Sequence, residues 1–254
     1  SSLLFGLGLS WLNGIYDNLI SSTIATGGHA RIISKSYHQR EILLPIEEHL
    51  SDVTDIRKIL EQDQKFVAFP IIKQWVLLST QNNQTGERSV SVAAEMDFFK
   101  QLFSQGRCQS SMSNQEGMTL GKDLAESLDV KLYDEVVMLG KTVDGSFSPI
   151  KKKVQRIVSC DNYILNSLAF LDYETASYMI DVTNGATEIV VFDQHTRYID
   201  LKNSEAEISQ EIEILDSKGN PTSFVFEKWN VRRPLADILP LTLTMNGIFG
   251  LLLT

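Results

Sequence analysis

The chain has 254 residues, of which 43% are hydrophobic and 22% are charged, so it has the composition of a globular protein with room for one large domain or two lobes with cores of their own. Its formal net charge of −9 at pH 7 is unfavourable for binding a nucleic-acid backbone, and no run of Lys and Arg forms a basic footprint. Nucleic acid is therefore set aside as a partner.

Both ends of the sequence are apolar and uncharged. Residues 3–12 read LLFGLGLSWL, and residues 238–254 read ILPLTLTMNGIFGLLLT. A membrane-spanning helix needs about 20 apolar residues, so neither run spans a bilayer by itself. A signal peptide fits poorly, because no basic segment or small-residue cleavage site accompanies the first run. We expect each run to be the truncated end of a transmembrane helix; two buried core segments are the alternative.

The N-terminal part predicts a helix, a strand and a second helix. Residues 15–24 have apolar side chains at helical spacing, which is typical of a stalk helix, and Gly27 and Gly28 end it. The segment His29–Lys35 alternates as a strand does. Pro45 marks the start of the next helix, whose apolar face is supplied by residues 46–60.

A hairpin and a short helix are predicted next. Lys65–Leu78 contains two apolar runs separated by Pro70, which predicts a strand and a continuation that do not form one uninterrupted ladder. The polar turn at residues 81–86 and the apolar return at Ser89–Ala94 complete a hairpin. Residues 98–103 then form an amphipathic turn of helix that ends at Gly106.

The most informative stretch is Gly117–Leu139. Leu120, Leu124 and Leu128 recur every four residues and predict a three-turn helix, with Thr119 as its N-cap. Val136–Leu139 is a short apolar run of strand type. The pattern alone predicts a helix followed by a strand, as in any α+β core.

The remaining sequence predicts strands with one further helix. The triple Lys at 151–153 indicates a solvated edge, which we prefer to a site for anionic lipid. The predicted elements are a strand through Val154–Ser159, a strand-to-helix passage at Ile164–Tyr178 with Asp172 as the cap, a strand at Thr187–Phe192, a helical pattern at residues 199–216, and a strand at Phe224–Trp229.

The stretch from Gly117 carries a family resemblance. The sequence GMTLGKDLAESLDV at 117–130, followed by YDEV at 133–136, resembles a signature of the extracytoplasmic domain of FtsX-like ABC permeases, which include the lipoprotein-releasing (Lol-type) and MacB-type transporters. The family pattern is G-x-x-(I/L)-G-x-x-L-A-x-x-L-x-V, then G-D-x-V. Tyr133 stands where the family prefers Gly, so the turn before the strand is expected to differ.

Other segments follow the family pattern in the same order. GHARIISKSY at 28–37 resembles the Lol-type branch, LDYETA at 171–176 resembles a strand that leads into a D-x-x-x-A helix, and Trp229 and Pro234 resemble the W-x-x-x-x-P-x-L that precedes the second membrane helix. The resemblance covers most of the chain.

The resemblance implies an α+β fold with two lobes, a porter-like α/β lobe and an inserted β-rich, Sabre-like lobe, between two truncated transmembrane helices. The two stalks are then expected to lie side by side. The implied segments are 1–26 (end of transmembrane helix 1 and stalk), 27–98 (first part of the porter-like lobe), 99–185 (Sabre-like lobe), 186–237 (second part of the porter-like lobe) and 238–254 (start of transmembrane helix 2).

The implied function is the extracytoplasmic domain of an ABC transporter permease in the bacterial inner membrane, on the periplasmic side. This domain would couple ATP hydrolysis in a separate cytoplasmic ATPase to the release or transfer of lipoproteins. The implied partners are that ATPase, a second permease copy or paralogue, and a lipoprotein or its periplasmic carrier.

Three alternatives remain. In the first, the domain is of the MacB efflux or mechanotransmission type and docks a periplasmic adaptor. In the second, it activates a cell-wall hydrolase as FtsX does; the chain length disfavours this alternative. The third alternative is a soluble α+β binding domain. The cargo, and the choice between a homodimeric and a heterodimeric permease, stay open.

The sequence marks no catalytic chemistry. The four His residues have no metal-ligand spacing, and no nucleophile elbow, P-loop or dinucleotide-binding glycine motif is present. We therefore predict that the domain is not an enzyme, with no catalytic residue, cofactor or metal, and we name no binding residue. His29 is expected to be structural. For Cys108 and Cys160 we slightly favour two free thiols over one disulfide.

Overall fold

The computed structural model describes residues 14, 23–24, 27–62, 66–80, 86–110, 117–193 and 223–232. The two apolar ends, most of the predicted stalk helix, the turn at 81–85 and the helical pattern at 199–216 lie outside these ranges. Within them, no helix has the length and apolar character needed to cross a membrane.

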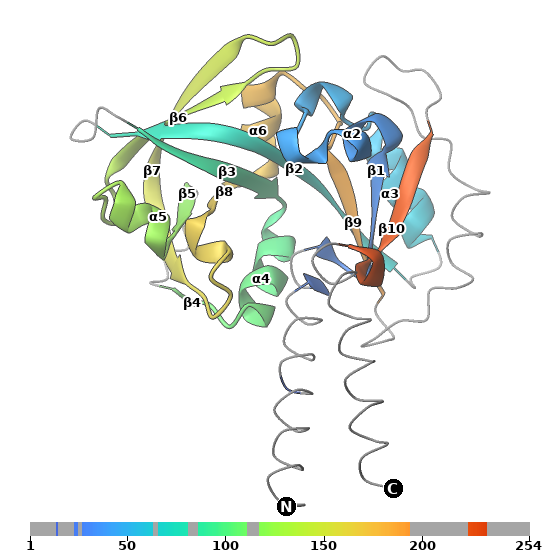
Figure 1. Cartoon of the computed structure of the whole chain (residues 1–254), viewed down its shortest axis with the longest axis horizontal. Coiled ribbons are helices and arrows are strands. Elements are labelled where there is room, and N and C mark those ends of the chain that lie inside the picture. The colour runs from blue at the N-terminus through green and yellow to red at the C-terminus, as the bar shows by residue number, and fades with distance from the viewer. Residues whose placement is uncertain are drawn as a thin grey trace, which may run out of the picture.

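The described elements mix helices and strands, so the predicted α+β class is confirmed (Figure 1). Short 3-10 helices connect several of them. The order is β1 (Ala30–Ser34), α2 (Lys35–Gln39), η1 (Glu41–Leu43), η2 (Ile46–Glu48), α3 (Val53–Glu61), β2 (Phe66–Ser79), β3 (Glu87–Ala94), α4 (Met96–Gln105), β4 (Gln109–Ser110), β5 (Met118–Gly121), α5 (Lys122–Ser127), β6 (Glu135–Lys141), β7 (Phe147–Ser159), η3 (Leu165–Ser167), β8 (Ala169–Asp172), α6 (Tyr173–Ile180), β9 (Glu188–Asp193), β10 (Phe224–Lys228) and η4 (Trp229–Val231).

One part of the fold is an antiparallel sheet in the order β10, β1, β9 and the first half of β2. Helix α3 packs Val53, Ile56 and Leu60 into a core with residues of β1 and β9. All five residues of β1 are buried, so the predicted alternation of buried and exposed residues is wrong there. The reason is that both faces of β1 are covered: Ala30 and Ile32 lie in the core with α3, and Arg31 on the other face contacts Glu41 of η1.

The second half of β2 belongs to a closed ring of six strands. It pairs with β3 on one side and with β6 on the other, and the ring continues from β3 through β8, β5 and β7 back to β6. Alternate side chains of these strands fill the interior, among them Ile72, Val76, Leu120, Met138 and Val154. Closure pairs the strand edges and leaves a single packed core inside the ring.

Strand β2 runs without interruption from one part of the fold to the other (Figure 1). The predicted break at Pro70 is wrong, because Pro70 pairs with Ile189 of β9 while the pairing with β3 begins only at Ile72. The missing N–H of Pro70 therefore does not interrupt the ladder to β3. The division into a porter-like and a Sabre-like lobe, with the boundaries given above, stays a prediction.

The signature stretch folds differently from its predicted helix. Met118–Gly121 is strand β5, and α5 covers only Lys122–Ser127, so Thr119 is not an N-cap. Leu120 pairs with Ile157 on one side and Ala169 on the other, and this pairing extends the strand into the predicted first turn. The predicted strand at Val136–Leu139 is confirmed within β6.

Several local predictions are confirmed. Strands β2 and β3 form the expected hairpin, α4 ends at Gly106, and Asp172 caps α6 by accepting a hydrogen bond of 2.6 Å from the N–H of Thr175. Strands β9 and β10 lie at the predicted positions. The helix predicted from Pro45 is wrong in its start: residues 46–48 form η2, and α3 begins at Val53.

The turn before β6 does not use the glycine that the family prefers. Tyr133 adopts φ 73°, a left-handed conformation that costs an L-residue about 1–2 kcal/mol. Its N–H donates to the carbonyl of Val154 at 2.7 Å, which holds the turn against β7. The turn therefore has a backbone conformation that suits glycine, and Tyr133 is strained in it.

Replacing Tyr133 by Gly is expected to raise the free energy of unfolding by about 1 kcal/mol, because relief of strain exceeds the entropy that Gly adds to the unfolded chain. The side chain is 58% exposed, so its removal loses little packing. Urea denaturation measures the change. Tyr133→Ala is the control, since it keeps the Cβ and its strain; equal stability of the Gly and Ala variants would contradict the explanation.

Candidate functional site

Six charged side chains from separate segments meet in the antiparallel sheet and form what we call the Arg31 cluster. Three are cations and three are anions, so the cluster has no net charge. Its members are Arg31 on β1, Glu41 on η1, Lys73 on β2, Glu188 on β9, Glu227 on β10 and Arg232 after η4.

Arg31 is the centre of this cluster. Its Nε donates to Glu227 Oε2 at 2.5 Å, and its two terminal nitrogens donate to the carboxylate of Glu41 at 2.5 and 2.8 Å. Its Nη1 also donates to Glu188 Oε2 at 3.1 Å. A planar guanidinium suits this arrangement, because its five N–H groups form a rigid fork. Arg31 therefore connects three elements that are far apart in the sequence.

Glu188 is the most buried anion of the cluster, with no exposed surface. Burial by itself raises the pKa of this carboxyl, but the positive charges of Lys73 and Arg31 outweigh burial and lower the pKa to about 2. The Glu188 carboxylate is thus ionised at neutral pH and holds β1, β2 and β9 together.

Arg232 ties the two ends of the described domain to each other. Its Nη1 donates to the carbonyl of Gly27, and its Nη2 donates to the carbonyl of Glu227 at 3.1 Å. A Cβ at Gly27 would lie 2.0 Å from Nη1 of Arg232, so a larger residue there would displace the guanidinium from this position. Burial lowers the pKa of Arg232 to about 10, which leaves it charged at neutral pH.

The backbone reinforces this junction. Strands β1 and β10 pair from Ala30 with Lys228 onward, and the N–H of Trp229 donates to the carbonyl of His29 at 3.0 Å. The chain therefore enters and leaves the domain at neighbouring positions. Each charge of the cluster faces an opposite charge, and these pairs join segments that are far apart in the sequence.

The histidines lie apart from this cluster. Nδ1 of buried His29 accepts a hydrogen bond of 3.1 Å from the N–H of Asp193, and Nδ1 of His49 lies 2.9 Å from the carbonyl oxygen of Ile46. His195 is outside the described residues. Across the described ranges, no group of three or more His, Cys, Asp or Glu side chains could hold a metal ion.

Two hollows lie in the surface of the described domain. The larger, about 510 Å³, lies between α4, β5, β7 and the start of α6, and its lining combines Phe99, Phe103 and Phe170 with charged residues such as Lys152 and Glu174. The smaller, about 180 Å³, lies between η1, η2, β2 and the end of β6. The sequence had marked neither.

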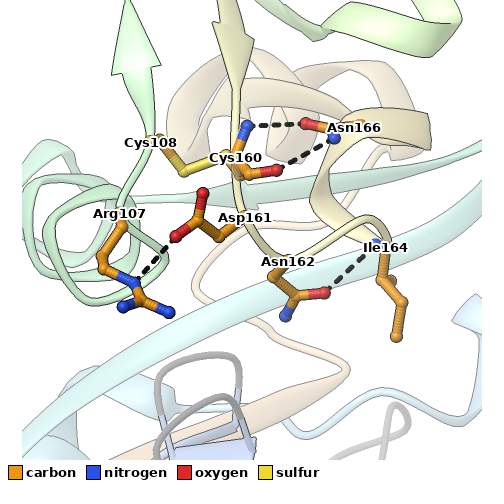
Figure 2. Close-up of a disulfide and its surroundings, with 7 residues drawn as sticks. All are labelled: Arg107, Cys108, Cys160, Asp161, Asn162, Ile164 and Asn166. Atoms are coloured by element: carbon orange, nitrogen blue, oxygen red, sulfur yellow. Dashed lines mark hydrogen bonds and ion pairs between the residues drawn. A yellow bond between two sulfur atoms is a disulfide. The ribbon is translucent and has the colours of Figure 1, made fainter. Parts of the chain in front are cut away.

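Cys108 and Cys160 form a disulfide, so the slight preference for free thiols was wrong (Figure 2). It joins the chain after α4 to the end of β7. Asn166 supports it, accepting from the N–H of Cys160 at 2.8 Å and donating to its carbonyl at 3.0 Å. Folding brings the two cysteines together across 52 positions of sequence, a distance that spacing alone does not reveal.

Sequence reasoning also missed the Arg31 cluster, whose members span residues 31–232. The available signal was a charge inside an apolar strand: Arg31 in ARIIS and Glu188 in EIVVFD. A buried charge needs an opposite charge nearby. The sequence alone does not reveal which partner each one has.

No protein family and no curated protein matches this sequence. Among solved structures, the chain is similar to the periplasmic region of MacB from Actinobacillus actinomycetemcomitans, with a TM-score of 0.52 and 11% identity over 81% of this chain and 91% of that chain. The extracellular domain of the ABC-type transporter YknZ from Gram-positive bacteria matches with a TM-score of 0.48 and 9% identity, over 78% and 98% of the two chains. The first likeness shows that this chain has a fold similar to that of the MacB periplasmic region.

Glu188→Gln is expected to lower the free energy of unfolding at pH 7 by about 3 kcal/mol, because Lys73 and Arg31 lose a buried partner. Because the pKa of folded Glu188 lies below its ordinary value, its ionised form stabilises the fold at neutral pH, and this stabilisation is lost as the pH falls from about 4.5 to about 2. The stability gap between wild type and variant should therefore narrow over that interval.

Chemical denaturation at a series of pH values measures this gap. Glu126→Gln is the matched control on an exposed helix face, and its effect should stay within about 0.5 kcal/mol at each pH. A stability difference between wild type and Glu188→Gln that stays constant from pH 7 to pH 2 would show that protonation of Glu188 does not cause the pH dependence of stability.

Proposed function

We propose that this chain is the extracytoplasmic domain of an ABC transporter permease. The observation that carries the proposal is the likeness of its fold to the periplasmic region of MacB over 91% of that chain. The sequence resemblance to FtsX-like permeases supports it independently, because it rests on motifs at 117–136 and not on overall shape.

The junction at Arg232 agrees with this role. An extracytoplasmic domain between two membrane helices must receive and return the chain at neighbouring positions. Gly27, at the start of the domain, and Arg232, at its end, are hydrogen-bonded to each other. The first and last residues of this junction are therefore neighbours, as the two ends of a permease's extracytoplasmic domain would be.

The disulfide agrees with the proposed side of the membrane. Disulfides persist in the periplasm and outside the cell and are rare in the cytosol, where thiols are kept reduced. The bond between Cys108 and Cys160 therefore favours a location on the periplasmic face of the inner membrane.

In this proposal the domain performs no bond chemistry and transmits movement. A cytoplasmic ATPase would bias a pair of permease domains between two arrangements, and each arrangement would bind the cargo or partner with a different affinity. For the cargo, we propose release of lipoproteins from the inner membrane to a periplasmic carrier, because GHARIISKSY at 28–37 resembles the Lol-type branch. The likeness to MacB favours the second candidate, an efflux or mechanotransmission domain that docks an adaptor.

The first test uses the full-length protein, expressed with an ATPase encoded beside its gene. We expect the two to copurify from membranes and to release an acylated lipoprotein from proteoliposomes when ATP is added. Copurification without release would favour the efflux or mechanotransmission candidate. A full-length protein that has no membrane helices and stays in the soluble fraction would overturn the transporter proposal.

The location is tested by the state of Cys108 and Cys160 in intact cells. We expect both thiols to resist a membrane-permeant maleimide until the cells are treated with a reductant. A Cys108→Ser variant leaves Cys160 without its partner and is the positive control for labelling. Removing the disulfide should also lower the stability of the fold by about 2–4 kcal/mol. Labelling of the wild type without reduction would argue against an oxidising compartment.

A further inference from the structure

The larger hollow, which we call the α4 pocket, has the size of a small-molecule site. Its volume is about 510 Å³, within the roughly 300–1,000 Å³ of ordinary ligand pockets. Its lining combines apolar residues of α4 and β8 with polar residues of β5, β7 and the start of α6. The pocket is therefore suited to a ligand that is itself part apolar and part polar.

The apolar part of the α4 pocket is aromatic. The rings of Phe99 and Phe103 stack with their centres 5.8 Å apart, and the ring of Phe170 meets that of Phe103 edge to face at 5.1 Å. Phe99 and Phe170 are buried, whereas Phe103 is half-buried and Met96, at the start of α4, is 53% exposed. A further planar ring can extend this arrangement, because aromatic rings prefer stacked and edge-to-face contacts and methionine sulfur makes favourable contacts with rings.

The polar part of the pocket contains an available cation. Lys152 on β7 is half-buried, and its Nζ donates to the hydroxyl oxygen of Thr175 at 3.0 Å. Within the described ranges, no carboxylate forms an ion pair with Lys152, although Lys73, a half-buried lysine of β2, is paired with Glu188. An ammonium group has three N–H donors, so Lys152 can donate to an acceptor in the pocket as well as to Thr175.

The carboxylates that line the pocket are engaged or screened. Glu95 is paired with Arg57 of α3, and Asp172 accepts from the N–H and the hydroxyl of Thr175 at 2.6 and 2.7 Å. Glu174 is exposed in the first turn of α6, where water and salt screen its charge. The pocket therefore offers a hydrogen-bond donor with a positive charge, and this favours an anionic ligand over a cationic one.

We propose that the α4 pocket binds a small carboxylic acid with an aromatic body. The carboxylate would accept a charge-assisted hydrogen bond from Nζ of Lys152, and the ring would lie against Phe103 and Met96. A cationic ligand would instead bring a like charge to Lys152 and to Arg156, which also lines the pocket. An acid without a ring would lose the aromatic contacts. This inference does not depend on the transporter role.

The test is a titration of the full chain, labelled with ¹³C-methyl methionine and followed by NMR, because Met96 lines the pocket. A Met96→Leu variant identifies the resonance. The three probes are hydrocinnamate, phenylpropylamine, which has the same ring and a positive charge, and octanoate, which is an acid without a ring. We expect hydrocinnamate to shift the Met96 methyl resonance at millimolar concentration, with at least fivefold weaker binding of the other two. No shift with hydrocinnamate, or equal binding of the amine or of octanoate, would overturn the proposal.

Neighbouring lysines of β7 provide matched variants. Lys152→Gln should weaken the binding of hydrocinnamate at least fivefold and leave that of the uncharged phenylpropanol unchanged, since only the acid uses the ammonium group. Lys151→Gln is the control, because Lys151 is exposed, lies 2.6 Å from the carboxylate of Glu135 and does not line the pocket. Unchanged binding of hydrocinnamate by Lys152→Gln, or an equal loss of the acid and the alcohol, would show that Lys152 does not bind the carboxylate.

Discussion

The structure depends on one strand that belongs to both parts of the fold. β2 has 14 residues, and its two halves have different partners: β9 in the antiparallel sheet, then β3 and β6 in the ring. Backbone N–H and C=O groups buried along such a strand must be paired, so both parts have to assemble around it. The sheet and the ring are therefore joined through the backbone hydrogen bonds of β2.

Three consecutive residues of β2 have different surroundings. Lys73 reaches Glu188 in the Arg31 cluster, the side chain of Gln74 is buried, and Trp75 is exposed at the surface. Because side chains alternate along a strand, adjacent positions face opposite sides and serve different surroundings. Glu41 lies on η1, which carries both this partner of Arg31 and the exposed apolar side chains of Ile42 and Leu43.

The Arg31 cluster is better explained as fixing the positions of the strands than as stabilising the fold. Burying three cations and three anions carries a large desolvation penalty, and apolar side chains of similar volume often stabilise a fold as well or better. The cluster instead fixes which strands meet and where the chain enters and leaves, through Arg31 at its centre and Arg232 at its edge. In the proposed permease role, this junction would hold the two ends of the domain together.

The sequence by itself determined the features whose causes are local. The β2–β3 hairpin, the Asp172 cap, the end of α4 at Gly106 and the strands β6, β9 and β10 follow from turn residues, capping chemistry and apolar runs of a few residues. The family resemblance likewise pointed to the fold that the MacB periplasmic region shares.

Tertiary structure alone decided the features that depend on partners distant in sequence. Pairing on both sides extended β5 over a predicted helix turn at Leu120, and interior placement buried every residue of β1. It also joined Cys108 to Cys160 and gathered the charges around Arg31, because such contacts arise from the packing of whole elements and leave no periodic trace in the chain.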